Sequence, residues 1–127
     1  MKNRGFTLLE VMTALLITMV LASLAVATYR MPVTKTHQAA AKLDLINLAS
    51  VIEEYYEQHH TYKDITLARL NFHSNVGEYQ VKVISASDSH FKIAAVPIIA
   101  HSHDDCGIFY LDQTGDQTVS GSGKQCW

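Results

Sequence analysis

Motifs that would carry enzymatic chemistry or bind zinc are missing from this 127-residue chain. It contains neither the G-x-S-x-G pattern of a nucleophilic serine nor the G-x-x-x-x-G-K-[ST] loop that holds phosphates. It has two cysteines, Cys106 and Cys126, and no C-x-x-C pair accompanies them, so a four-ligand zinc site has little support. We therefore expect a protein that is not an enzyme and that carries no cofactor.

Basic residues are also scarce in most of the chain. From Met31 onward there are 7 Lys+Arg against 11 Asp+Glu, a net charge of −4, and no run of lysines or arginines. A body of this sign is unsuited to sequence-independent binding of a phosphate backbone. The composition therefore predicts no nucleic-acid partner.

Apolar residues make up 48% of the sequence, but they are unevenly distributed. Eighteen of the 24 residues from Phe6 to Tyr29 are apolar, and the 19 residues Val11–Tyr29 carry no formal charge. A helix of that length spans about 28 Å, close to the hydrocarbon thickness of a bilayer. The pattern predicts one membrane-spanning helix followed by a water-compatible domain, and it excludes a polytopic membrane protein.

A cleaved secretory signal is one interpretation of this N-terminal segment. Lys2 and Arg4 would supply its basic region, and Ala25–Ala27 has the small-residue pattern of a cleavage site before Thr28. The apolar stretch is longer than the usual ~7–15 residues, however, and Glu10 lies within it. A carboxylate in the membrane costs about 2.5–3.5 kcal/mol at the helix centre and less near the interface. Such a charge suggests that Glu10 has a partner.

The segment Lys2–Glu10, KNRGFTLLE, followed by the apolar run, resembles the class III signal of type IV pilins and related pseudopilins. In that family a prepilin peptidase cuts after the glycine and methylates the new N-terminal amine. The resemblance implies cleavage between Gly5 and Phe6 and N-methylation of Phe6. It also implies that Glu10 pairs with the amine of a neighbouring subunit and so sets the axial register of the filament.

Physical chemistry agrees with these implied roles. Gly5 has no side chain, so a protease at the membrane face can approach its backbone closely. The new amine of Phe6 is cationic, and Glu10 is the obvious counter-charge. A buried charge that lacks its partner costs more free energy than the ion pair contributes. Charge alone leaves the orientation open, since basic residues lie on both sides of the apolar run. The resemblance implies a cytoplasmic N-terminus and a periplasmic body.

Beyond the apolar run, the periodicity remains helical as far as about Gln58. Pro32 is expected to kink or loosen this helix, because proline lacks an N–H and clashes with the preceding turn. We expect one long helix from Phe6 to about Gln58, with an apolar half and an amphipathic half. Apolar residues of the second half recur at i, i+3, i+4 and i+7 spacing, at Leu45, Leu48, Ala49, Ile52, Tyr55 and Tyr56.

After Thr66 the hydrophobic pattern changes to a period of two. Apolar and polar residues alternate in 79–83, and Phe91, Ile93 and Ala95 alternate with Lys92. Further short strands are expected near Ile108–Tyr110 and at Val119.

Turn residues separate these runs. Pro97 should end the second run, Asp112–Asp116 is typical of a hairpin turn, and Ser120–Gly123 is typical of a flexible connector. The economical architecture is an α+β fold in which one antiparallel sheet packs on the amphipathic half of the helix.

The later part of the chain resembles the same family less specifically. Residues 54–62, EYYEQHHTY, are similar to the helix end and Gly-Thr-Tyr of many pilins, with His60 in place of the glycine. Residues 106–127 resemble the disulfide-closed region of short minor pilins of the PilE type. The resemblance therefore implies a type IV pilin fold with a Cys106–Cys126 disulfide, which is also the natural interpretation of two cysteines outside the cytoplasm.

Three groups of polar residues suggest metal binding without establishing it. His101–Cys106 combines two histidines with carboxylates, His59–His60 lies at the expected helix end, and Asp112 with Asp116 loosely resembles a calcium loop. Ligands adjacent in sequence seldom all point at one ion, and the calcium-loop pattern is incomplete. We interpret these groups as exposed polar and turn residues and expect no metal site.

Together these observations predict a leader peptide (residues 1–5), a transmembrane and filament-core helix (6–30) and a periplasmic or extracellular globular pilin domain (31–127). We expect a structural subunit of a type IV pilus, a minor pilin, that lies in the bacterial inner membrane before assembly and on the cell surface afterwards. Its expected partners are other pilins, prepilin peptidase, the pilus assembly machinery and inner-membrane lipid. A type II secretion pseudopilin, an adhesive or DNA-uptake pilin, and a periplasmic protein released at Ala27 remain the alternatives.

Overall fold

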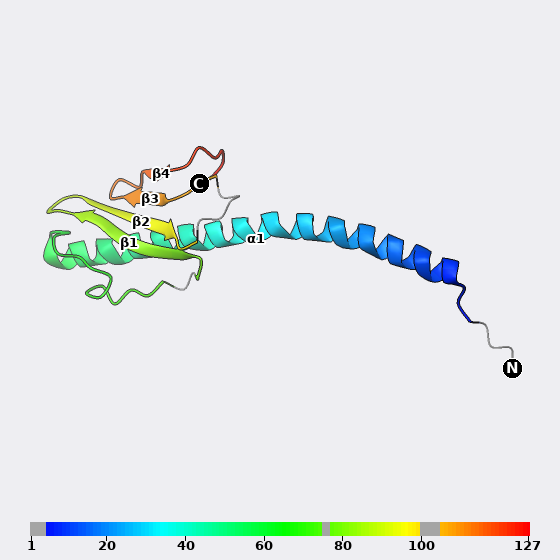
Figure 1. Ribbon diagram of the computed structural model, residues 1–127. Helices are drawn as coiled ribbons and strands as arrows, with labels where there is room; N and C mark the ends of the chain where they lie inside the picture. The colour runs from blue at the N-terminus through cyan, green and yellow to red at the C-terminus, as the bar shows by residue number, and fades with distance from the viewer. Residues whose placement is uncertain (1–4, 75–76, 100–104) are drawn as a thin grey trace. The chain divides into compact units, whose positions relative to one another are not determined.

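The computed structural model describes residues 5–74, 77–99 and 105–127 (Figure 1). Within these residues it contains one helix and four strands, in the order α1-β1-β2-β3-β4. The chain divides into two compact units, Met1–Lys35 and Thr36–Trp127. Helix α1 contributes residues to both units, whereas the strands belong entirely to the second.

Helix α1 comprises the 52 residues Leu8–His59. It begins later than the predicted Phe6, because the Thr7 hydroxyl accepts a hydrogen bond from the Glu10 N–H at 3.3 Å and so acts as an N-cap. The helix runs without a break through Pro32, so the expected loosening does not interrupt it.

In the first unit, α1 begins with a long apolar stretch. Its stretch Leu8–Val26 has a mean hydropathy of 2.2, and none of this stretch is buried within the chain. By length and composition it could cross a membrane. Four hydroxyls between Leu8 and Thr28 donate to carbonyls three or four residues earlier at 2.8–3.0 Å, namely Thr13 to Glu10, Thr18 to Ala14, Ser23 to Val20 and Thr28 to Leu24. The segment therefore presents apolar surface while the helix itself pairs these hydroxyls.

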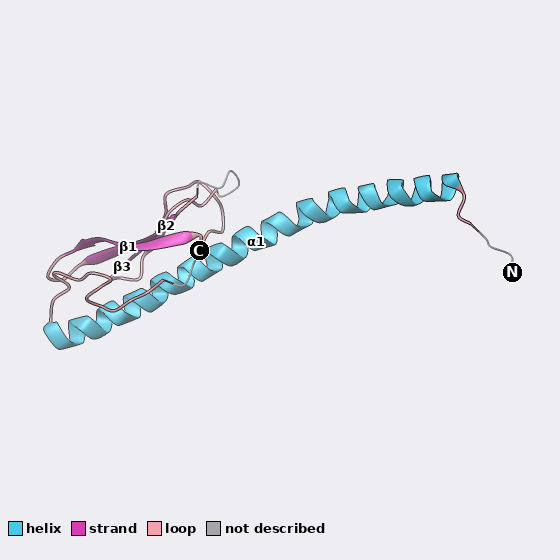
Figure 2. Ribbon diagram, turned by 60° about the horizontal axis from the view of Figure 1, so that its bottom comes forward, coloured by secondary structure: helices cyan, strands magenta, loops and turns pink. Residues whose placement is uncertain are grey.

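The second unit contains a four-stranded antiparallel sheet in the order β1-β2-β3-β4. Figure 2 shows strands of this sheet in magenta. Strands β1 and β4 are its edges, and the pairing of β1 with β2 shifts register between Val83 and Ser85. Neighbours in sequence are neighbours in the sheet, which is the economical connection of short antiparallel strands. The bounds are Tyr79–Ala86 for β1, Phe91–Pro97 for β2, Phe109–Asp112 for β3 and Gln117–Val119 for β4.

The core lies between one face of this sheet and the amphipathic half of α1. Ala41, Leu45, Leu48 and Ile52 on the helix are all fully buried. This arrangement confirms the predicted α+β fold and the predicted buried face of the helix. The helix residues cluster with buried side chains from the sheet and from the loop that precedes it, including Tyr62, Ile65, Tyr79, Val81, Phe91, Ile93, Ala95, Phe109 and Leu111.

Strand β3 occurs where a strand is expected, but its buried residues are Phe109 and Leu111. Tyr110, which marks the strand in the sequence pattern, is only half-buried, because it alternates with Phe109 and Leu111 and lies on the other face of the strand. Three consecutive residues of this strand are apolar, so alternation alone does not show which of them face the core.

Ser120–Gly123, expected to be a flexible connector, is instead held against the chain that precedes β3. The N–H of Gly121 donates to the carbonyl of Cys106, and the N–H of Gly123 donates to the carbonyl of Asp105, both at 2.9 Å. A Cβ atom at Gly121 would overlap the Asp105 carbonyl. The expectation of flexibility was wrong, because glycine is needed here for the close approach of two backbones.

Candidate functional site

Gly5 and Phe6, the predicted cleavage site, lie immediately before α1 in backbone that is not helical. The Phe6 side chain is 82% exposed, and a Cβ atom at Gly5 would meet no neighbour within 4 Å. The bond between these residues is therefore accessible. Nothing in the described part of the chain requires glycine at position 5, so a demand for it would come from an enzyme that approaches the bond.

Glu10 lies in the first turn of α1. A carboxylate near the N-terminal end of a helix interacts favourably with the positive end of the helix dipole. The sequence places no other formal charge between Glu10 and Arg30. Glu10 is therefore an isolated charge at one end of an apolar helix, which suits a single specific ion pair.

Thr7 completes this group, although neither composition nor periodicity singles it out. Its hydroxyl accepts from the Glu10 N–H at 3.3 Å, and its carbonyl accepts from the Val11 N–H at 3.2 Å. Residues 7–10 have the T-x-x-E spacing of a capping box, and that local signal would have identified Thr7. The cleavage site, the N-cap and the carboxylate thus lie within one short segment, residues 5–10.

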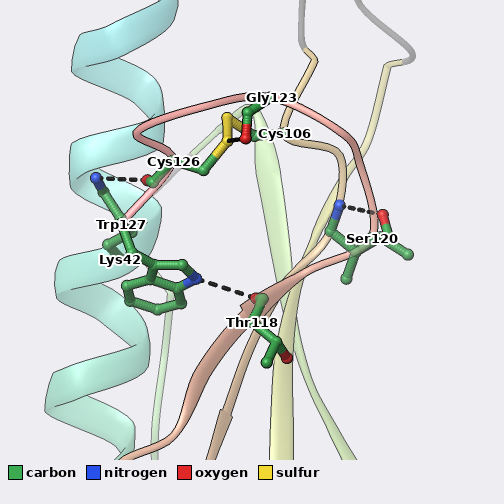
Figure 3. The surroundings of a disulfide bond; sticks show 8 residues. Lys42, Cys106, Thr118, Ser120, Gly123, Cys126 and Trp127 are labelled. Carbon is green, nitrogen blue, oxygen red and sulfur yellow. Dashed lines mark hydrogen bonds between the residues drawn. A yellow bond between two sulfur atoms is a disulfide. The ribbon is translucent and has the colours of Figure 1, made fainter.

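Cys106 and Cys126 form a disulfide with their Cα atoms 5.7 Å apart, which confirms the predicted pairing (Figure 3). Lys42 of α1 donates a hydrogen bond to the Cys126 carbonyl at 2.9 Å, and its Nζ lies 6.0 Å from the centroid of the Phe109 ring. The C-terminal stretch is therefore tied both to the start of β3 and to the helix.

Trp127 holds the end of the described chain against β4. Its indole N–H donates to the Thr118 carbonyl at 3.0 Å, and its ring packs edge-on against Phe109 with 5.5 Å between centroids. The Ser120 hydroxyl accepts from the Ile108 N–H at 2.9 Å. Figure 3 shows the hydrogen bonds of Trp127 with Thr118 and of Ser120 close to the disulfide. The C-terminal stretch is thus held in place by contacts of Trp127 and Ser120 as well as by the disulfide, and the spacing of the cysteines alone does not reveal these contacts.

Aromatic side chains pack at the C-terminal end of α1. Tyr55 stacks on His59 with ring centroids 4.0 Å apart, and Tyr56 stacks on Tyr62 at 4.4 Å. The Tyr62 hydroxyl donates to both carboxylate oxygens of Glu53 at 3.1 Å. Burial, and next this hydrogen bond, raise the pKa of Tyr62 to about 12. These contacts join the helix end to the loop that follows it.

The Asp112 carboxylate is engaged by its own turn. One oxygen accepts from the Thr114 N–H at 2.9 Å, from the Thr114 hydroxyl at 2.6 Å and from the Asp116 N–H at 3.0 Å. The Thr114 hydroxyl is the main cause that lowers the pKa of Asp112. Among the described residues, no group of three or more His, Cys, Asp or Glu side chains could hold a metal ion. His101–Asp104 lies outside the described residues.

The sheet face opposite α1 carries basic and aromatic side chains. Lys82 of β1 and Tyr110 of β3 both pair in register with Ala94 of β2, so they lie on the same face. Lys92, two residues from Ala94, shares this face, and its Nζ lies 4.8 Å from the centroid of the Tyr110 ring. We call Lys82, Lys92 and Tyr110 the outer-face cluster. Its chemistry suits contact with phosphate or other acidic groups.

Two family models match the chain. One, described as type IV minor pilin ComP, DNA uptake sequence receptor, matches residues 27–110, well over half of the chain. The other, described as the prokaryotic N-terminal methylation motif, matches residues 1–26.

Among solved structures, the crystal structure of the Neisseria meningitidis non-core minor pilin PilV is similar, with a TM-score of 0.59. The match is 23% identical and covers 72% of this chain and 90% of that chain. At this identity the likeness concerns the fold. No curated protein matches the sequence.

Proposed function

Because the chain belongs to the family of the type IV minor pilin ComP, we propose that it is processed by prepilin peptidase and assembled into a type IV pilus through its N-terminal helix. The observation that carries this proposal is the match to the N-terminal methylation motif over residues 1–26, which includes the exposed apolar helix Leu8–Val26. A minor pilin is a structural subunit, so its mechanism is assembly.

Leader removal is proposed between Gly5 and Phe6, with methylation of the new Phe6 amine. The exposure of Phe6 and the open space around Gly5 support this site. The non-helical backbone supports it further, because the groups that a protease must contact are not used in helix hydrogen bonds.

After cleavage, Glu10 is proposed to pair with the amine of a neighbouring subunit. A carboxylate and an amine that both leave water are costly unless they meet, and one axial stagger of two subunits neutralises both. The absence of other charges between Glu10 and Arg30 supports a single register, since no second pairing competes with it.

The subunit is proposed to wait in the bacterial inner membrane with its N-terminus in the cytoplasm and residues 31–127 in the periplasm. The apolar helix supports membrane anchoring, and the disulfide suits an oxidising compartment. The hydroxyls of the apolar segment bond to carbonyls of the same helix, so the segment can move from lipid into a filament without losing them.

Intact mass and N-terminal sequencing of the protein recovered from bacterial membranes test the processing step. We expect a chain that begins at N-methylated Phe6. A chain that begins at Thr28 would instead identify a secreted protein released after Ala27, and the pilin assembly mechanism would fail.

Replacing Glu10 by alanine tests the assembly step. We expect the amount of protein in sheared pili, relative to membranes, to fall by at least about tenfold, because an unpaired charge is left at the helix interface. Glu57→Ala is the matched control, since it removes an exposed carboxylate from the other end of α1. Equal incorporation of the two variants would contradict the register role of Glu10.

DNA binding is a second candidate function. The family description names a DNA uptake sequence receptor, and the outer-face cluster supplies two lysines on the same sheet face as the half-buried ring of Tyr110. The net charge of −4 from Met31 onward opposes binding that depends only on the phosphate backbone. This candidate therefore requires recognition of particular sequences.

Selection of duplexes from a random-sequence library with the full chain at ~150 mM salt tests this candidate. A selected duplex should bind Lys82→Glu/Lys92→Glu about tenfold more weakly and Lys63→Glu, an exposed control, unchanged. If no duplex is enriched, the prediction of no nucleic-acid partner stands and the second candidate is dropped.

A further inference from the structure

We propose that Thr7 is a positioning residue for leader removal, because its capping bond keeps the Gly5–Phe6 peptide outside α1. The inference rests on the proposed cleavage at that peptide. It assigns to a side chain of the substrate itself the task of presenting the scissile bond to the enzyme.

The geometry at the helix start carries the first step. The Thr7 hydroxyl accepts the Glu10 N–H, and the Thr7 carbonyl accepts the Val11 N–H as the first α-helical bond. Leu8 is consequently the first helical residue, and Phe6 and Gly5 precede the cap. An N-cap residue itself has non-helical backbone angles, so it fixes where the helix stops as well as stabilising it.

The chemistry of peptide cleavage supplies the second step. A protease must reach the Gly5 carbonyl carbon and polarise its oxygen. If the helix extended upstream through Gly5, that oxygen would accept the N–H of Leu9 in the i to i+4 pattern. The carbonyl would then be turned along the helix axis and already hydrogen-bonded, and the enzyme would have to unwind a turn before it could react.

The sequence makes such an extension a real alternative. Two upstream residues, Gly5 and Asn3, are of types that cap helices. A cap at Gly5 would already engage its carbonyl with the Leu9 N–H, and a cap at Asn3 would place Gly5 within the first turn. The helix penalty of Gly5 opposes this extension by only about 1 kcal/mol. A second determinant of the helix start is therefore needed, and Thr7 provides it.

Cleavage kinetics of the full-length chain in detergent, with a purified prepilin peptidase, test the proposal. Thr7→Val keeps the branched shape but removes the acceptor, so we expect kcat/KM to fall about fivefold, equivalent to about 1 kcal/mol, a typical cost of losing an N-cap. The loss should lie mainly in KM, because a smaller fraction of the substrate has the competent conformation. Hydrogen exchange at the Glu10 amide should quicken in the same variant.

Two replacements and one control separate capping from other roles. Thr7→Ser and Thr7→Asn both cap helices, and both should be cleaved within about twofold of the original chain. Thr13→Val removes a hydroxyl that donates to the Glu10 carbonyl inside the helix, and it should be cleaved normally. Trp127 fluorescence confirms that residues 36–127 are folded in every variant.

Three outcomes would count against the proposal. Normal cleavage of Thr7→Val would overturn it outright. Rescue by serine but not by asparagine would show that the enzyme contacts the hydroxyl directly, which also overturns the capping role. If the unaltered chain is not cut after Gly5, the proposed processing itself fails, and this inference fails with it.

Discussion

The two parts of α1 place the same kind of residue in opposite surroundings. In the apolar half, Leu8–Lys35, the Leu16 side chain is 65% exposed, whereas Leu48 in the amphipathic half is fully buried. The amphipathic half buries one stripe against its own sheet, so it needs no other molecule. The stretch Leu8–Val26 of the apolar half is not buried within the chain, so its apolar surface is left for lipid or other subunits to cover.

Polar groups show the same contrast. In the apolar half, hydroxyls bond to carbonyls three or four residues away, as Thr18 does with Ala14. In the head, which we define as Thr36–Trp127, local bonds are joined by bonds between distant elements, and Lys42 and Cys126 are 84 residues apart. The first arrangement survives a change of surroundings, whereas the second exists only while the tertiary fold is intact.

Leu48→Ala should have the largest effect on the stability of the head. Removing a fully buried leucine from the core should lower the free energy of unfolding by about 3 kcal/mol. Urea unfolding of the full chain in detergent measures it through Trp127, the one tryptophan, which packs in the head.

Leu16→Ala is the matched control from the apolar half. We expect its unfolding free energy to stay within about 0.5 kcal/mol of the original, because Leu16 is 65% exposed and is not a member of the head core. Equal losses in the two variants would break the distinction between the halves.

Gly121→Ala tests the contrast between glycines that serve the fold and Gly5. A Cβ atom at Gly121 would overlap the Asp105 carbonyl, so we expect a loss of about 2 kcal/mol. Gly77→Ala, where a Cβ atom meets nothing within 4 Å, and Gly5→Ala should leave the unfolding curve unchanged. A stable Gly121→Ala head would show that the Ser120–Gly123 segment moves freely after all.

Tyr62→Phe tests a polar bond that exists only in the head. At neutral pH, loss of the bond to Glu53 should cost about 1 kcal/mol. Because folding raises the pKa of Tyr62 from 10.0 to about 12, the unfolded chain loses this proton first as the pH rises. The contribution is therefore complete below pH 10.0 and is lost towards pH 12.

Unfolding curves collected from neutral to alkaline pH should decline over that interval more steeply for the original chain than for Tyr62→Phe. Parallel declines would mean that the other five of the six tyrosines, or the lysines, cause the change.

His60→Gly should have the smallest effect, and it should be stabilising. His60 has a φ of 57°, in the left-handed region where glycine is favoured, and it follows directly after α1. We expect a gain of about 0.5–1 kcal/mol, with His73→Gly, an exposed loop residue with a negative φ, as the control. A loss would show that the edge contact between His60 and Tyr56 outweighs the backbone strain.

The helix face and most strands could be predicted because their signals are local. Leu45, Leu48 and Ile52 recur at helical spacing, and β1 alternates residue by residue. The left-handed angle at His60 also explains why the related pilin pattern has glycine there. Hydrophobic periodicity predicts too early a start for α1, because it does not contain the local capping signal of Thr7.

Other features depend on partners that are distant in sequence. The close packing of Gly121 requires Asp105, and the position of Lys42 requires the Cys126 carbonyl. Neither residue type nor spacing identifies such partners. At the candidate site, the residues Gly5, Phe6 and Glu10 could be named from the motif, because they are consecutive elements of one short segment.

Strand β1 bears on how copies of this chain coexist before they assemble. It is an edge strand of eight residues, long enough to template pairing with a second chain. The register shift between Val83 and Ser85 bends that edge, and the exposed charge of Lys82 opposes a like strand beside it. A bent and charged β1 therefore disfavours edge-to-edge pairing between the sheets of two copies, and it leaves the exposed apolar stretch Leu8–Val26 as the surface on which copies can associate.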